Sequence, residues 1–286
     1  MQVTIEEDLL PANAETLRIY YESVEKGNFL DIMDTLAEEI TYVISGRPSV
    51  LPFSGVWSGK KKVTELFQAF GAAFQLLNLK ENLVINSSRR VISCNDESFA
   101  VFKTGIFYRV PVLHIAEFND ENRIVKFTNI HDTSTAEQAF SGDDPALVPI
   151  MPISPLVVAK TAFSHEIVKG LAQSLVDCIF EGQPMSKSNQ VSTFHLYIPG
   201  LPHRDLISGV WTGTLLEHEY PKRLAKFKID RNLQKGVAQI DRVTLSDGQL
   251  AIEGNLIGRD NPWCIAAHLN NKSFSAASLH IDFEAL

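Results

Sequence analysis

The sequence has few cysteines and no long apolar run, and each shortage excludes a class of protein. Its 286 residues include only three cysteines, Cys94, Cys178 and Cys264, which lie far apart and form no Cys-x-x-Cys pair. This spacing argues against a disulfide framework and a cysteine-based metal site, and it fits a reducing compartment. No apolar run reaches the roughly 18 residues that a membrane-spanning helix needs.

Positive charge is also scarce. The chain has 26 Lys and Arg against 34 Asp and Glu, which gives a formal net charge of −8. Nucleic-acid binding requires clustered basic residues, and the short cluster at 60–62 is typical of a solvated helix start. The first ten residues are acidic and lack the basic region of a signal peptide. We therefore expect a cytoplasmic protein with no nucleic-acid partner and no membrane association.

Hydrophobic periodicity predicts an α+β fold for the first part of the chain. Leu17, Tyr20, Tyr21 and Val24 recur at spacings of three and four, which predicts a helix over 14–25. The runs that follow predict a second helix over 29–37, a strand over 40–45, a third helix from 61, and strands over 79–86, 89–94, 98–110, 112–118 and 124–131. Helices followed by an antiparallel sheet form an α+β pattern.

A proline-rich segment divides the chain into two predicted domains, residues 1–140 and 156–286. Residues 141–155 carry four prolines, which predicts an extended linker. The next residues have the spacing of an amphipathic helix over 156–180. Seven strand-like runs follow it, at 191–198, 206–216, 224–230, 237–245, 250–257, 263–269 and 274–283. Short strands in this number predict an all-β, barrel-like antiparallel meander.

One short motif occurs in both halves. Ser-Gly-Val-Trp-Ser-Gly spans 54–59, and Ser-Gly-Val-Trp-Thr-Gly spans 208–213. The first copy leads into a predicted helix and the second into predicted strands, so the flanks indicate two unrelated domains and not a duplication. The second copy also resembles the Gly-x-Trp that starts the first strand of lipocalin-like barrels.

Three stretches resemble the nuclear-transport-factor-two-like superfamily, which includes ketosteroid isomerases and SnoaL-like polyketide cyclases. Residues 17–42 resemble its first two helices and first strand, 53–70 its entry to the third helix, and 114–140 its last hairpin and closing tail. The resemblance covers about residues 12–140. It implies a cone-shaped α+β barrel, in which a curved antiparallel sheet wraps three helices around an apolar cavity. It also implies a small apolar ligand, a homodimer, and acid–base chemistry without a metal or cofactor.

The resemblance also assigns positions in that cavity. Ketosteroid isomerases use a tyrosine and a protonated aspartic acid to donate hydrogen bonds to an enolate oxygen, while a second aspartate moves the proton. By resemblance Tyr20 takes the tyrosine position and His114 the donor-acid position. Ile44 falls near the position of the proton-moving aspartate, which argues against isomerisation of 3-oxosteroids by that mechanism.

Strand alternation adds further candidates. His114 shares a strand face with Phe118, and Asn129 and His131 share one with Phe127. A histidine with an unperturbed pKa near 6.5 exchanges protons at neutral pH. The candidate catalytic residues are therefore Tyr20, His114, Asn129 and His131, and the candidate ligand-binding residues are Ile44, Trp57, Phe67, Phe118 and Phe127. Each tyrosine, tryptophan or histidine here also has an alternative interpretation as a structural residue, and no metal site is predicted.

Three functions stay open at this point. The first is metal-free acid–base chemistry on a small hydrophobic molecule, of the isomerase, cyclase, dehydratase or epoxide-opening type. The second is non-catalytic binding or transport of such a ligand. The third is a dimeric assembly module.

Overall fold

The computed structural model describes residues 2–5, 11–87, 89–145, 164–185, 193–197, 209–212, 215–230, 238–246, 249–256, 262–270 and 273–281. The chain forms two compact units, Asp8–Pro155 (the N-terminal unit) and Met1–Glu7 with Leu156–Leu286 (the C-terminal unit). The first residues belong to the C-terminal unit because strand β1 (Gln2–Ile5) pairs with β10 (Ala238–Ser246). Residues 146–155 of the predicted linker lie outside the described part.

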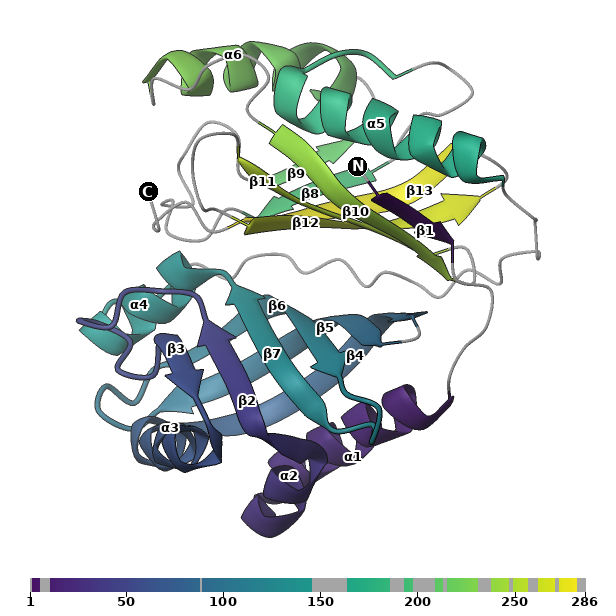
Figure 1. Cartoon of the computed structure of the whole chain (residues 1–286). Coiled ribbons are helices and arrows are strands. Elements are labelled where there is room, and N and C mark those ends of the chain that lie inside the picture. Colours follow the sequence, from purple (N-terminus) through teal and green to yellow (C-terminus); the bar gives the residue numbers. More distant parts are fainter. Residues whose placement is uncertain are drawn as a thin grey trace. The chain divides into compact units, whose positions relative to one another are not determined.

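The N-terminal unit contains one six-stranded sheet in the order β3-β2-β7-β6-β5-β4. Its strands are β2 (Leu36–Ile44), β3 (Gly55–Ser58), β4 (Phe74–Ser87), β5 (Arg90–Val101), β6 (Phe107–Phe118) and β7 (Ile124–His131). Its helices are α1 (Pro11–Lys26), α2 (Phe29–Thr35), α3 (Lys60–Ala73) and α4 (Thr133–Ser141). Figure 1 shows the sheet curving over α1, α2 and α3. The predicted α+β class and curved sheet are confirmed, but the edge strands β3 and β4 do not pair, so the described strands form no closed barrel.

Local sequence explains where these helices begin and end. One face of α1 is buried by Leu17, Tyr20 and Tyr21, and the helix stops at Gly27, whose φ of 66° suits glycine. Asp132 caps α4 by accepting a hydrogen bond from the backbone N–H of Thr135 at 3.2 Å. These ends hold α1 and α4 against the sheet.

The long hairpin of β5 and β6 differs from the predicted strands. The sequence predicts a break at Asn95, Asp96 and Glu97, but β5 continues through all three, and the turn comes later, around Gly105. The strand tolerates these polar residues because alternate side chains face opposite sides of the sheet. Asp96 forms a hydrogen-bonded ion pair with Arg109, whose Nε lies 2.6 Å from Oδ1.

The C-terminal unit contains a seven-stranded sheet in the order β1-β10-β11-β12-β13-β8-β9. Its remaining elements are α5 (His165–Glu181), β8 (Thr193–Tyr197), β9 (Gly209–Thr212), a π-helical turn (Leu215–Glu219), α6 (Tyr220–Asp230), β11 (Gln249–Leu256), β12 (Pro262–Asn270) and β13 (Ser273–Ile281). Figure 1 shows α5 and α6 on the same face of this sheet. Apolar side chains of these helices and of the sheet form a second core, which includes Trp211, Tyr220 and Trp263.

This unit corrects the prediction of an all-β, lipocalin-like meander. The predicted strand over 224–230 is part of helix α6, in which Tyr220, Leu224 and Phe227 bury one helical face. The pairs β1–β10 and β13–β8 are parallel, so the sheet is not an antiparallel meander. Its edge strands β1 and β9 do not pair with each other, so the described strands form an open sheet.

The two units share one topology. The order β9-β8-β13-β12-β11-β10 repeats β3-β2-β7-β6-β5-β4 strand for strand and in the same chain order. The parallel pair β8–β13 takes the place of β2–β7, and α6 takes the place of α3. Trp57 and Trp211 lie on equivalent edge strands. The interpretation of the repeated motif as two unrelated uses is therefore wrong, since a helix follows both copies.

Candidate functional site

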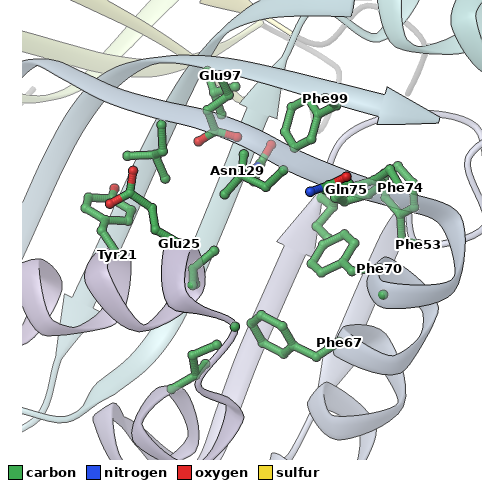
Figure 2. A pocket seen from close by; sticks show the side chains of 18 of the residues that line it. Tyr21, Glu25, Phe53, Phe67, Phe70, Phe74, Gln75, Glu97, Phe99 and Asn129 are labelled. Carbon is green, nitrogen blue, oxygen red and sulfur yellow. The ribbon is translucent and has the colours of Figure 1, made fainter. Parts of the chain in front are cut away.

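A cavity of about 490 Å³ lies between the sheet and the helices of the N-terminal unit. This volume is in the range of small-molecule sites. Its apolar wall is largely aromatic and includes Phe53, Phe67, Phe70, Phe74 and Phe99. Its polar lining includes Tyr20, Tyr42, Glu97, His114, Asn129 and His131. Figure 2 shows the phenylalanine side chains gathered on one side and Glu97 with Asn129 on another.

Three of the predicted catalytic residues form one hydrogen-bonded chain across β6 and β7. Asn129 Nδ2 lies 2.8 Å from His114 Nε2, and Asn129 Oδ1 lies 2.9 Å from His131 Nδ1. The pairing of His114 with Asn129 in the β6–β7 register brings them together. In this arrangement Nδ1 of His131 is protonated and donates to Asn129. The other nitrogen of His131, Nε2, has no hydrogen-bond partner among the side chains that the structure describes.

The opposite side of the His114 ring is also engaged. Its Nδ1 lies 2.9 Å from the hydroxyl of Tyr21 and 2.8 Å from the amide of Asn95. Asn95 Oδ1 is buried without a partner within the described chain, and a half-turn of that amide would let Oδ1 accept Nδ1–H. With both ring nitrogens bonded to protein groups, His114 positions its neighbours and has no nitrogen left for a ligand.

Burial sets the charge of both histidines. Desolvation lowers the pKa of His114 to about 3, with a further contribution from His131. It lowers the pKa of His131 to about 4. Both rings are therefore neutral at neutral pH, and the value near 6.5 assumed for them from sequence does not apply in this cavity.

The carboxyl group of Glu97 is a functional candidate that the sequence analysis missed. The residue is 5% exposed, and burial raises the pKa of its side chain from 4.5 to about 8. Its Oε1 has no hydrogen-bond partner in the described structure and lies 3.6 Å from His114 Nε2. Because the acid and the ring are both neutral near pH 7, this contact is not an ion pair. Figure 2 shows the carboxyl group of Glu97 pointing into the cavity.

Tyr20 and Tyr42 supply a pair of hydroxyl groups to the same cavity. Their oxygens are 2.8 Å apart, so one hydroxyl donates to the other. The accepting hydroxyl keeps its own proton for a further hydrogen bond. Burial raises the pKa of both phenols well above the ordinary value, so both stay neutral donors. Tyr42 was not among the residues predicted from sequence.

The predicted ligand-binding residues have different places in the structure. Ile44 and Phe67 line the cavity. Phe127 is fully buried and does not line it, but stacks against Tyr42 with ring centroids 4.7 Å apart. Phe118 is a core residue. Trp57 is outside the cavity lining as well, and its Nε1 donates to the backbone oxygen of Phe53 at 2.9 Å.

The described residues contain neither a candidate metal cluster nor a membrane-spanning helix. No group of three or more His, Cys, Asp or Glu side chains there could hold a metal ion. None of the helices among them has the length and apolarity required to span a bilayer.

Comparison with known proteins found solved structures that are similar to part of this chain. No protein-family model matches the chain, and no curated protein matches it. An NTF2-like (nuclear-transport-factor-two-like) protein of unknown function from Burkholderia pseudomallei is 18% identical, with 46% of this chain and 98% of that chain covered and a TM-score of 0.43. An NTF2-like protein from Burkholderia xenovorans is 15% identical, with 46% and 96% covered and a TM-score of 0.42. TerC, co-crystallised with polyporic acid, is 14% identical, with 46% and 98% covered and a TM-score of 0.41.

These matches concern somewhat under half of this chain. The α+β fold of the N-terminal unit rests on its own helices and strand order. Sequence identities below 20% carry no information about activity in this chain. The roles of its side chains follow from their own geometry.

Proposed function

We propose that the N-terminal unit binds a small, largely apolar molecule and transfers a proton on it, with Glu97 as the proton-transfer group. The observation that carries this proposal is a buried carboxyl group without a hydrogen-bond partner in the described structure. Leaving such a group unsatisfied costs stability. A pKa of about 8 is also close to that of an efficient acid–base catalyst at neutral pH.

The chemistry that suits this site is enolisation of a carbonyl compound. At pH 7 about a tenth of the Glu97 side chains would be ionised, and that carboxylate can remove a proton from the carbon beside the carbonyl group. The hydroxyl pair of Tyr20 and Tyr42 can donate a hydrogen bond to the resulting enolate oxygen. Glu97 can then return the proton to carbon. His114 and Asn129 position the site, and Nε2 of His131 offers a further acceptor.

Hydrogen–deuterium exchange of a compact bicyclic ketone, 2-tetralone, tests this proposal. The compound is incubated in D₂O with the whole protein, and loss of its α-proton signals is followed by NMR. We expect exchange at least tenfold faster than in buffer alone, rising as pH approaches 8. Glu97→Gln should lower the protein-catalysed rate by roughly 10²–10⁴-fold, the usual contribution of general acid–base catalysis.

The matched control is Glu117→Gln, which changes a glutamate that forms ion pairs with Arg90 and Lys126 instead of lining the cavity. This variant should exchange like the unmodified protein. Exchange at the buffer rate with the unmodified protein, or equal rates for Glu97→Gln and Glu117→Gln, would refute Glu97 as the proton-transfer group.

Non-catalytic binding is the second candidate function, and the apolar side chain of Ile44 favours it. A fluorescent phenol of similar size, 2-naphthol, distinguishes the two. Saturable binding of 2-naphthol without any exchange of 2-tetralone would favour a carrier. The homodimer and the cytoplasmic location expected from the sequence stay predictions.

A further inference from the structure

The two units match in strand register as well as in strand order. In the N-terminal unit Tyr42 pairs with Trp57 on one side and Phe127 on the other. In the C-terminal unit Phe194 pairs with Trp211 and with Ala277 in the same way. The edge strands that carry the repeated motif therefore define equivalent positions across each sheet.

A shared irregularity confirms this register at the other end of the sheets. The pairing of β4 with β5 shifts between Glu81 and Leu83. The pairing of β10 with β11 shifts between Ile240 and Arg242. When the strand pairings are followed across each sheet from Trp57 and from Trp211, Glu81 becomes equivalent to Ile240 and Leu83 to Arg242. The two shifts therefore occur at equivalent positions. A β-bulge is a specific structural feature, so its recurrence supports one fold built twice.

Prolines give a third, independent match. Pro111 on β6 pairs with Asp96 on β5. Pro262 on β12 pairs with Asn255 on β11. The same register makes the two prolines equivalent, and proline is uncommon inside a sheet because it cannot donate a ladder hydrogen bond.

We infer that the C-terminal unit is a second copy of the N-terminal fold in which packed apolar side chains replace the ligand site, so that the described part of the chain carries one site of this kind. The register assigns counterparts to seven polar strand residues in or beside the site, and none of these seven counterparts has a polar side chain. The pairs are Tyr42 and Phe194, Ser93 and Ile252, Asn95 and Gly254, Glu97 and Leu256, His114 and Ile265, Asn129 and Leu279, and His131 and Ile281.

Four of these counterparts are core residues. Ile252, Leu256, Ile265 and Leu279 are at most 3% exposed and belong to one apolar cluster. At these four buried positions, the polar side chains of the N-terminal unit are replaced by apolar ones in the C-terminal unit. These differences in polarity therefore lie in the interior of the fold and not on its surface.

A tryptophan occupies the room that the site would need. Trp263 is the counterpart of Val112, is 1% exposed, and packs on Phe180 with ring centroids 5.0 Å apart. A Cβ atom at Gly254 would come within 2.4 Å of the Trp263 ring. Glycine at the Asn95 position is thus what allows the larger ring to fill this interior.

Crystals of the whole chain pressurised with xenon test the inference, because xenon enters apolar cavities whatever their chemistry. In the unmodified protein we expect xenon in the N-terminal cavity beside Phe67 and none in the C-terminal core. Trp263→Val, which installs the counterpart residue, should create a new xenon site beside Gly254. Ile265→Ala serves the same purpose with a smaller change if Trp263→Val does not fold.

Two results would overturn the inference. One is xenon within the Ile252–Ile265–Leu279 cluster of the unmodified protein, since that interior would then contain a cavity. The other is a crystallographic register in which the shift in β10 is not equivalent to that in β4. Neither result depends on proton transfer by Glu97, so failure of the proposed enzyme activity would leave this inference intact.

Discussion

Replacing Glu97 with glutamine should change how the stability of the protein depends on pH. Burial raises the pKa of the folded protein's Glu97 from 4.5 to about 8. For such a group the contribution to stability is complete below about pH 4.5 and is lost as pH rises towards 8. The buried histidines have the opposite sign, because their lowered pKa values make stability fall as pH drops below about 6.5. Together these groups predict greatest stability near pH 6.5.

The magnitude follows from the two pKa values of Glu97. With 4.5 in the unfolded chain and about 8 in the folded one, linkage predicts a loss of about 2 kcal/mol between about pH 6.5 and pH 8.5. Glutamine has nearly the same shape and does not ionise, so Glu97→Gln should not show this loss. The variant should therefore gain about 2 kcal/mol relative to the unmodified protein over that interval.

Guanidinium denaturation of both proteins at a series of pH values measures this difference. Subtracting the two curves at each pH removes the titration of every other group, which both chains share. The reasoning is refuted if the two curves run parallel from pH 6.5 to pH 8.5. A ¹³C NMR titration that places the Glu97 carboxyl below about pH 6 would refute it independently.

Three further changes test the packing around the site and in the second unit. Asn129→Leu should cost about 2–4 kcal/mol in unfolding free energy, because it removes the hydrogen bonds that Asn129 makes with His114 Nε2 and His131 Nδ1; Thr128→Val on the opposite strand face should cost much less. Gly46→Ala should cost more than Gly55→Ala, since both have a positive φ but only at Gly46 would a Cβ meet two side chains at 2.7 and 2.8 Å; denaturation midpoints compare them. Gly254→Ala should abolish folding of the C-terminal unit, measured by circular dichroism, because its Cβ would lie 1.9 Å from a backbone oxygen.

Periodicity was enough to predict most of the N-terminal unit. Apolar spacing predicted α1 and α3, and strand alternation placed Asn129 and His131 on one face. The resemblance to a known superfamily then supplied the cavity towards which these residues point. His114, Asn129 and His131 could be grouped from sequence because neighbouring strands of a hairpin keep a fixed register.

The sequence analysis missed Glu97 because its polar neighbours predict a turn where the structure has a strand. Three consecutive polar residues, Asn95, Asp96 and Glu97, are typical of a turn, and the ion pair of Asp96 with Arg109 that stabilises the strand is not local. The alternation of Asn95, Glu97 and Phe99 was the signal that could have shown a cavity-facing strand. The shifts in pKa depend on burial, which no spacing in the sequence reports.

The duplication was rejected from sequence because one helix was interpreted as a strand. In residues 226–230 apolar and charged side chains alternate, as they do in a strand, and the helical period becomes clear only when Tyr220 is counted with Leu224 and Phe227. Without α6, the second Trp motif had no helix after it. The short motif itself was the correct signal, and its flanks were misread.

Comparison of the two units shows that different residues determine the fold and the ligand site. Equivalent register, an equivalent bulge and equivalent prolines persist although the interiors differ in polarity, so the backbone does not require a polar interior. An apolar core avoids the cost of burying polar groups without partners. The N-terminal unit nevertheless keeps Glu97 Oε1 and Asn95 Oδ1 buried and unpartnered within the described structure. Trp263 Nε1 of the C-terminal unit is also buried without a partner in the described structure, so the cost alone does not distinguish the two units. What distinguishes Glu97 is that its carboxyl group lines a cavity, where a bound molecule would satisfy it.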